Sequence, residues 1–338
     1  MDAALNEQSV TTEQEDFLDY LHASIAETLR VPESEILIKL NKHKYHDAGA
    51  PDVTNGDLTE VFNIMRELNL AGVSNPSLGR GHNGGLSLRE ALQQTVRELA
   101  TRCDPGAYHY VELGPEPIKT ALILEGLADL AAPPASYLGI DINPASRPVM
   151  REAVARYVPA GSLRQVVDDY ERLERLPLPW DRKPALVTML GFQEGNEPPS
   201  DMTDWYRRLL RPGDMLLCEM QLVPQSDWSP IYCFYNDDLM RRFSRKTLTA
   251  KFGDVKSEYG VTVVAMPPGY PAKGIVVMTT ERIVDGGPFN GKIVVTNYCT
   301  KYPADEFRTL REANGAFEVL CQTVTGDGSI AFQLARRR

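Results

Sequence analysis

The segment YHYVELGPEPIKT, residues 108–120, decides the fold. It is a short apolar run that ends at Gly114 and passes directly into a helical pattern. Such a strand-to-helix junction opens a βαβ unit, and its glycine lets the backbone approach a ligand at the carboxyl edge of a parallel sheet. The segment therefore predicts both a parallel sheet and the place of its ligand site.

The same alternation of apolar runs and helical patterns continues to residue 223. The further apolar runs are YLGIDI, LRQVVDDY, PALVTMLGF and DMLLCEMQLV, which begin at Tyr137, Leu163, Pro184 and Asp214. Strands that alternate with crossover helices are typical of a doubly wound, mostly parallel sheet. We predict an α/β fold with a Rossmann-like core.

The segments on either side of this core have other patterns. TEQEDFLDYLHASIAETLR and DLTEVFNIMRELNL predict helices, and Ser87 with Glu90 predicts a capping box at the start of the next one. Beyond residue 223, β-rich runs between Gly and Pro turns indicate an inserted antiparallel unit, and FEVLCQTVTGDGSIAFQLARRR indicates a closing hairpin. The predicted division is a helical substrate or lid part at 1–85, a cofactor-binding core at 86–222, an inserted substrate subdomain at 223–302 and the end of the core sheet at 303–338.

The charge balance and the cysteines argue against several classes of function. Lys and Arg total 36 against 46 for Asp and Glu, and the formal net charge of -10 repels phosphate backbones and anionic lipid. The five cysteines include no CxxC pair, and the five histidines show no metal-ligand spacing. A signal-peptide pattern and a long apolar run are both absent from the sequence. We expect a cytoplasmic protein without metal, nucleic-acid or membrane partners, and a homodimer is left open.

Acidic residues stand at the ends of two further strands. Asp141 ends YLGID, where a carboxylate accepts hydrogen bonds from both hydroxyls of a ribose. Asp169 and Tyr170 end VVDDY, where an adenine ring is bonded at its edge and covered by an aromatic side chain. Any α/β protein has acidic residues at strand ends, but three consecutive strand ends together favour a cofactor site. The first turn lacks the G-x-G-x-x-G cradle for a pyrophosphate, which favours S-adenosylmethionine over a nicotinamide dinucleotide.

Four segments resemble the histidine-specific amino-acid N-methyltransferases of the ergothioneine pathway and their natural-product relatives. The family's first motif, E-L-G-x-G-x-x-x-K-T, is matched by ELGPEPIKT, with Glu116 in place of the middle glycine. Its G-S-T-I-G-N-[FL]-x-P loop after the fourth strand is matched by GFQEGNEPP. Its A-Y-[DN]-D and T-E-x-S-x-K-[YF] segments are matched by FYND and TNYCTKY. The resemblance extends from about residue 108 to the C-terminus.

The resemblance implies roles for the matched residues. Those assigned to the cofactor site are Glu112, Gly114, Lys119, Thr120 and Gly191. Asn196 and Tyr235 are expected to hold the amino and carboxylate groups of the substrate, and Tyr45, in the faintly matching segment KYHD, is expected beside them. The alternatives are an asparagine that only satisfies a tight loop and a tyrosine that only fills the core.

Two departures from the family decide the predicted substrate. Asn297 and Cys299 replace the Glu and Ser that grip an imidazole in the family, so we expect both in the substrate pocket and expect histidine to bind poorly. Glu194 and Glu197 replace apolar residues of the fourth-strand loop, and carboxylates match a guanidinium in charge and geometry. We predict that both glutamates are catalytic and hold arginine; the alternative is a solvated surface loop.

The sequence thus predicts an S-adenosylmethionine-dependent N-methyltransferase of a small free amino acid, arginine first, in bacterial secondary metabolism. Histidine or an aromatic amino acid, methylated on nitrogen, carbon or oxygen, is the nearest alternative. A catalytically inactive binding protein is the alternative from another class, because Pro115 and Glu116 alter the family's first loop.

Overall fold

A seven-stranded sheet forms the core of the computed structural model, which describes residues 12–38, 55–82, 84–170, 173, 175–178 and 182–338. The strand order is β10-β11-β6-β5-β2-β3-β4, with β2 to β6 parallel and β11 antiparallel to both neighbours. The strands are β2 His109–Leu113, β3 Ser136–Asp141, β4 Leu163–Val167, β5 Ala185–Met189, β6 Met215–Gln221, β10 Phe317–Val324 and β11 Ile330–Arg337. The predicted doubly wound core and its closing hairpin are confirmed.

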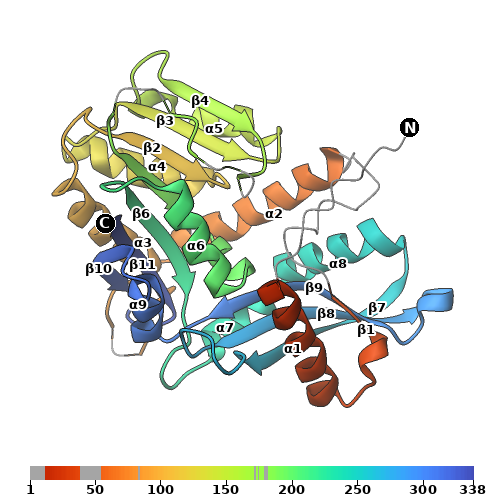
Figure 1. Ribbon diagram of the computed structural model, residues 1–338. Coiled ribbons are helices and arrows are strands. Elements are labelled where there is room, and N and C mark those ends of the chain that lie inside the picture. The colour runs from red at the N-terminus through yellow and green to blue at the C-terminus, as the bar shows by residue number, and fades with distance from the viewer. Residues whose placement is uncertain (1–11, 39–54, 83, 171–172, 174, 179–181) are drawn as a thin grey trace, which may run out of the picture.

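Helices cover both faces of this sheet (Figure 1). They are α3 Leu88–Ala100, α4 Pro117–Asp129, α5 Ser146–Val154, α6 Pro199–Leu209 and α9 Ala304–Glu312. The helices α3, α4 and α5 contribute to one apolar cluster, and α6 and α9 contribute to the other. The predicted capping box at Ser87 and Glu90 opens α3. Among the described helices, none is both long and apolar enough to cross a bilayer.

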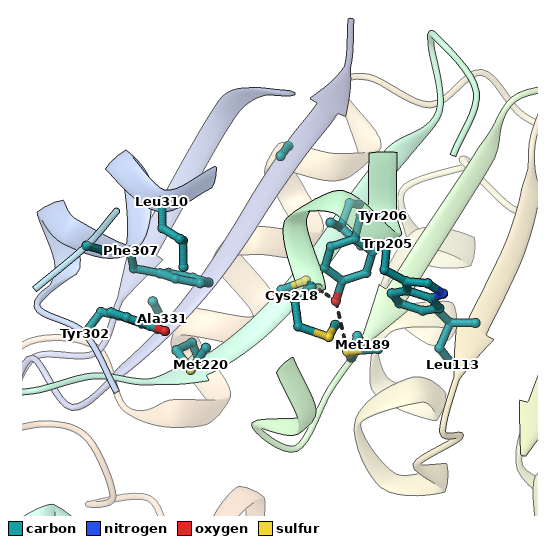
Figure 2. Close-up of a cluster of buried hydrophobic side chains, with 14 of the residues drawn as sticks. Leu113, Met189, Trp205, Tyr206, Cys218, Met220, Tyr302, Phe307, Leu310 and Ala331 are labelled. Carbon is teal, nitrogen blue, oxygen red and sulfur yellow. Dashed lines mark hydrogen bonds between the residues drawn. The ribbon is translucent and has the colours of Figure 1, made fainter. Parts of the chain in front are cut away.

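The cluster under α6 and α9 fixes the base of the loop that follows β5 (Figure 2). Tyr206 of α6 is fully buried, and its hydroxyl donates to the Met189 Sδ at 2.9 Å. The rings of Trp205 and Tyr206 have centroids 5.0 Å apart. Because Met189 ends β5, this packing ties α6 to the strand end from which GFQEGNEPP departs. The loop therefore starts from a rigid base.

A second sheet of four strands lies beside the core (Figure 1), with the order β1-β9-β8-β7. Strands β7 Lys256–Ala265, β8 Ile275–Asp285 and β9 Ile293–Lys301 are antiparallel, as expected of the inserted unit. This part of the structure also contains two helices, α7 Ser229–Tyr235 and α8 Asp238–Phe252. A two-residue strand, β1 Ile36–Leu37, pairs in parallel with β9. N-terminal residues thus complete a sheet made mostly by the insertion; the four domain boundaries stay a prediction.

Two N-terminal helices, α1 Thr12–Leu29 and α2 Asn55–Ser74, pack on this arrangement. In Figure 1, α2 runs between the core and the second sheet. Two surface ion pairs join it to α8: Glu60 lies 2.9 Å from Lys246, and Glu67 lies 3.5 Å from Arg242. Its apolar side packs through Ile64 into a cluster with α7 and α8. Helix α2 is therefore held across the edge where the core strands end.

Candidate active site

A cavity of about 280 Å³ opens at the carboxyl ends of β2, β3, β4 and β5. In a doubly wound sheet this edge is where ligands bind. The opposite wall is built from α2, α7, α8 and β9, so the core and the second sheet both contribute to it. Of the predicted site residues, those that line the cavity are Gly114, Asp141, Asp169, Tyr170, Gly191, Asn196, Glu197, Tyr235, Asn297 and Cys299.

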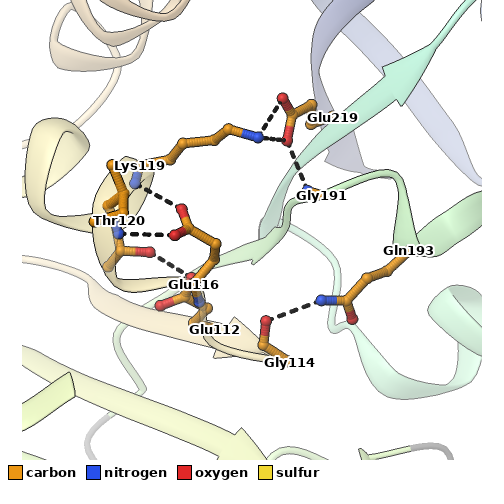
Figure 3. Close-up of polar contacts among 9 residues, drawn as sticks. Glu112, Gly114, Glu116, Lys119, Thr120, Gly191, Gln193 and Glu219 are labelled. Atoms are coloured by element: carbon orange, nitrogen blue, oxygen red, sulfur yellow. Dashed lines mark hydrogen bonds and ion pairs between the residues drawn. The ribbon is translucent and has the colours of Figure 1, made fainter. Parts of the chain in front are cut away.

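The first loop turns at Gly114, which has a φ of +63° and lines the cavity. The side-chain amide of Gln193 donates to the Gly114 carbonyl oxygen at 3.0 Å, as Figure 3 shows. A Cβ at Gly114 would overlap this amide, so both the backbone angle and the contact require glycine. The Tyr170 hydroxyl donates to the other end of the same amide at 3.2 Å. Gln193, which the sequence reasoning missed, therefore links the ends of three strands.

Glu112 and Thr120 support this loop and do not line the cavity. Glu112 is fully buried, and its carboxylate accepts from the Glu116 backbone amide at 3.0 Å, the Tyr137 hydroxyl at 2.8 Å and the Thr120 hydroxyl. Burial raises the pKa of Glu112 to about 8. The expectation that these two residues contact the cofactor is corrected, because their hydrogen bonds hold the loop in shape.

Glu116, in the position of the family's glycine, caps α4 and lines the cavity. Its carboxylate accepts from the backbone amides of Ile118 at 2.9 Å and Lys119 at 2.7 Å (Figure 3). Burial raises its pKa, and the charge of Lys119 opposes that shift. A carboxylate at a helix N-terminus is favoured by the helix dipole and by the amides that it satisfies.

Lys119 is also a structural residue: it is buried and lies outside the cavity lining. Its Nζ lies 2.6 Å from both carboxylate oxygens of Glu219 on β6. One of those oxygens accepts from the Gly191 backbone amide at 2.6 Å (Figure 3). The pair thus ties α4 to β6 and to the start of the GFQEGNEPP loop that follows β5. The assignment of Lys119 to direct cofactor contact is therefore corrected.

The ends of β3 and β4 present the predicted polar groups to the cavity. Asp141 accepts from the Asn143 backbone amide at 3.1 Å, and burial raises its pKa. The Asn143 side chain donates to the Leu58 carbonyl oxygen at 2.9 Å and so connects this edge to α2. Asp169 and Tyr170 line the next part of the wall, where the Tyr170 ring packs against Trp205 at 5.7 Å between centroids.

The two glutamates of the GFQEGNEPP loop, which follows β5, have different environments. Glu194 is buried and forms an ion pair with Arg311 of α9, and it is absent from the cavity lining. The expectation that Glu194 clamps a substrate is therefore corrected, because an internal guanidinium already occupies its carboxylate. Glu197 is also buried, at 6% exposure, but it lines the cavity next to Asn196. Because both glutamates are buried, neither fits the alternative of a surface loop whose carboxylates face solvent.

The substrate-pocket residues predicted from the insertion gather on one wall. Tyr235, Asn297 and Cys299 are buried and line the cavity, and burial raises the pKa of Tyr235 well above its usual value. Behind them the buried Lys301 donates to the Cys299 Sγ at 3.0 Å, and burial lowers the pKa of this lysine. Tyr45 lies outside the described residues. The family positions thus converge here, although they come from α7 and β9.

The cavity wall carries an excess of negative charge that the sequence reasoning noted only in part. Its acidic side chains are Glu116, Asp141, Asp169 and Glu197. Arg66 of α2 is the basic side chain among the described lining residues. The sequence of α2 showed only a helical apolar spacing. Such a spacing predicts that one face of the helix is buried, but it does not predict that this face lines a cavity. Such a cavity favours ligands that carry positive charge.

Comparison with known proteins identifies the chemistry. Residues 89–251, just under half of the chain, match the family described as histidine-specific methyltransferase, SAM-dependent. No curated protein matches the chain. The protein is thus an S-adenosylmethionine-dependent methyltransferase.

Solved structures resemble the chain only weakly. A possible exported protein from Bordetella parapertussis is 12% identical over 97% of this chain and 99% of its own, with a TM-score of 0.44. The CcbJ methyltransferase from Streptomyces caelestis is 13% identical over 73% and 89%, with a TM-score of 0.38. The 1,6-didemethyltoxoflavin-N1-methyltransferase from Burkholderia thailandensis is 13% identical over 87% and 97%, with a TM-score of 0.37. Scores below 0.5 support no functional inference.

Proposed function

We propose that this S-adenosylmethionine-dependent methyltransferase transfers its methyl group to a nitrogen of a small free amino acid, with L-arginine as the first candidate. The observation that carries the proposal is Glu197, a buried carboxylate in the wall of an acidic cavity, adjacent in sequence to Asn196. A guanidinium is planar, permanently charged and suited to a carboxylate partner. With Glu194 paired internally, Glu197 alone carries the proposed clamp.

The described residues fit the cofactor. Asp141, Asp169 and Tyr170 line the cavity at the strand ends. In the proposal, Asp141 accepts hydrogen bonds from the ribose hydroxyls, and Asp169 with Tyr170 borders the adenine. Gly114 and Gly191 keep the adjoining backbone free of side chains, with φ of +63° and +72°. The cofactor supplies a methyl group already activated on a sulfonium, so the protein has to align the nucleophile and exclude water.

In the proposal, the other residues of the cavity wall align the attacking nitrogen of the substrate with the methyl group. Asn196 offers both a donor and acceptors to the amino end of the substrate, and Tyr235 offers a hydroxyl. Glu197 holds the guanidinium and takes the proton that its nitrogen must lose on methylation. Helix α2 closes the side of the cavity opposite the strand ends and limits the access of water.

Histidine is the second candidate, and the family match favours it. Against it, Asn297 and Cys299 stand in the wall where the family's imidazole-gripping Glu and Ser are expected. The roles in secondary metabolism, the cytoplasmic location and a homodimer stay predictions.

Labelled S-adenosylmethionine and a panel of free amino acids test the proposal. We expect turnover with arginine to exceed that with histidine and tyrosine. A charge-assisted hydrogen bond contributes about 1.5 to 3 kcal/mol, so Glu197→Gln should lower kcat/KM for arginine roughly ten- to a hundredfold. The matched control is Glu152→Gln, an exposed glutamate on α5 away from the cavity. Robust methylation of histidine with negligible arginine turnover would contradict the arginine assignment.

A further inference from the structure

Helix α2 presents a continuous face to the cavity, and one residue on it is charged. The lining residues of this helix are Leu58, Val61, Phe62, Met65, Arg66 and Asn69. Their three- and four-residue spacing places them on one side of the helix. Arg66 is half-buried there and is the cation among the described residues of the cavity wall.

The guanidinium of Arg66 has no partner within the described part of the chain. Its neighbours three and four positions away on α2 are Phe62, Asn63, Asn69 and Leu70, and none of them is acidic. The two glutamates of α2 in the described range point elsewhere, because Glu60 pairs with Lys246 and Glu67 pairs with Arg242. These two pairs hold the helix against α8 and leave Arg66 facing the cavity.

A half-buried arginine that lines a ligand cavity and has no partner among the described residues is suited to bind an anion. Arg presents a rigid fork of donors that matches a carboxylate in two-pronged geometry. The other charged groups of this wall are carboxylates, so they repel the carboxylate of any amino-acid ligand. A ligand that carries both a cationic group and a carboxylate therefore needs a local positive charge for its anionic end.

We infer that Arg66 binds the α-carboxylate of an amino-acid group held in this cavity. The inference extends the proposed function, because both ligands of an amino-acid methyltransferase carry such a group. One source is the substrate amino acid, and the other is the methionine part of the cofactor. In either case α2 contributes a specificity-determining residue that rejects the corresponding decarboxylated amine.

Two arms of one experiment separate the sources. Arg66→Met keeps the length and apolar stem of the side chain and removes its charge. If the substrate carboxylate binds there, KM for arginine should rise at least tenfold, while turnover of agmatine, which is arginine without its carboxylate, stays unchanged. If the cofactor carboxylate binds there, the Kd for S-adenosylmethionine measured by calorimetry should rise at least tenfold, while that of decarboxylated S-adenosylmethionine stays unchanged.

Two further variants complete the test. Arg66→Lys should recover part of the lost affinity, because it restores the charge without the two-pronged geometry. Arg89→Met, which removes an exposed arginine of α3 outside the cavity, should change neither constant. If wild-type enzyme methylates no amino acid, the proposed function fails, and the cofactor arm alone decides the role of Arg66. Unchanged affinity for the cofactor, together with unchanged or absent amino-acid binding, overturns the assignment.

Discussion

Removal of one partner from the buried pair between Glu194 and Arg311 should be among the most destabilising single substitutions in the core. The two side chains are 3% and 1% exposed, and Arg311 also donates from its Nε to the Gln333 Oε1 at 3.0 Å. Arg311→Met would leave the Glu194 carboxylate buried without a countercharge, beside Tyr206 and Cys218. Removing one partner of a buried pair costs about 3 to 5 kcal/mol in the free energy of unfolding.

Urea unfolding in the absence of cofactor measures this loss. The double variant Glu194→Gln/Arg311→Met buries no charge, so it should recover much of the stability that Arg311→Met loses, and the coupling appears in a double-mutant cycle. Arg308→Met on the same helix is the control, because its ion pair with Glu312 is half exposed. Such surface pairs contribute less than about 1 kcal/mol.

The same experiment tests whether Glu194 belongs to the substrate site. If Arg311→Met unfolds within about 1 kcal/mol of wild type, the pair does not neutralise Glu194, and this glutamate becomes a candidate clamp again. If the pair is as strong as expected, folded Glu194→Gln should keep kcat/KM for arginine close to wild type while its unfolding free energy falls.

Three further outcomes are expected. Asp141→Ala should raise the Kd for S-adenosylmethionine at least tenfold by calorimetry, and unchanged affinity of the folded variant would remove the ribose assignment. Asn196→Ala and Tyr235→Phe should each raise the KM of the amino acid with little change in cofactor affinity, whereas equal loss of both would indicate damage to the fold. Glu112 has a pKa raised from 4.5 to about 8, so its contribution to stability is complete below pH 4.5 and is lost as the pH rises to about 8. Urea unfolding between pH 5 and 8.5 should therefore show a steeper fall in stability for wild type than for Glu112→Gln, and parallel curves would contradict the shift.

Local patterns were enough to predict the sheet and half of the site. Asp141 and Tyr170 could be placed because the carboxyl ends of parallel strands meet at one edge, whatever the rest of the chain does. Ser87 could be assigned as a cap because the capping box is complete within four residues. These features depend on neighbours in the sequence or on a general property of the fold.

The parts that the sequence could not predict depend on pairings between distant segments. Glu194 lies 117 residues from Arg311, and a polar run such as GFQEGNEPP looks like a surface loop until α9 docks against it. Lys119 matches a family position, but only its 2.6 Å contact with Glu219 shows that it supports the loop. The two-residue strand β1 is too short to carry a pattern, and it forms because β9 offers it an edge.

Glu116 shows why a change in the family's first loop is compatible with this cofactor. In folds that bind dinucleotides, the free amides at the start of the first helix hold a pyrophosphate. Here the carboxylate of Glu116 occupies the amides of Ile118 and Lys119, so the helix start already carries an anion of its own. That anion repels a phosphate, but it is compatible with a cofactor that has none and that carries a sulfonium and an ammonium group. The charge of Glu116 thus acts against dinucleotide binding at this loop. We expect Glu116→Gly to open an anion site at the start of α4 and to leave S-adenosylmethionine binding intact.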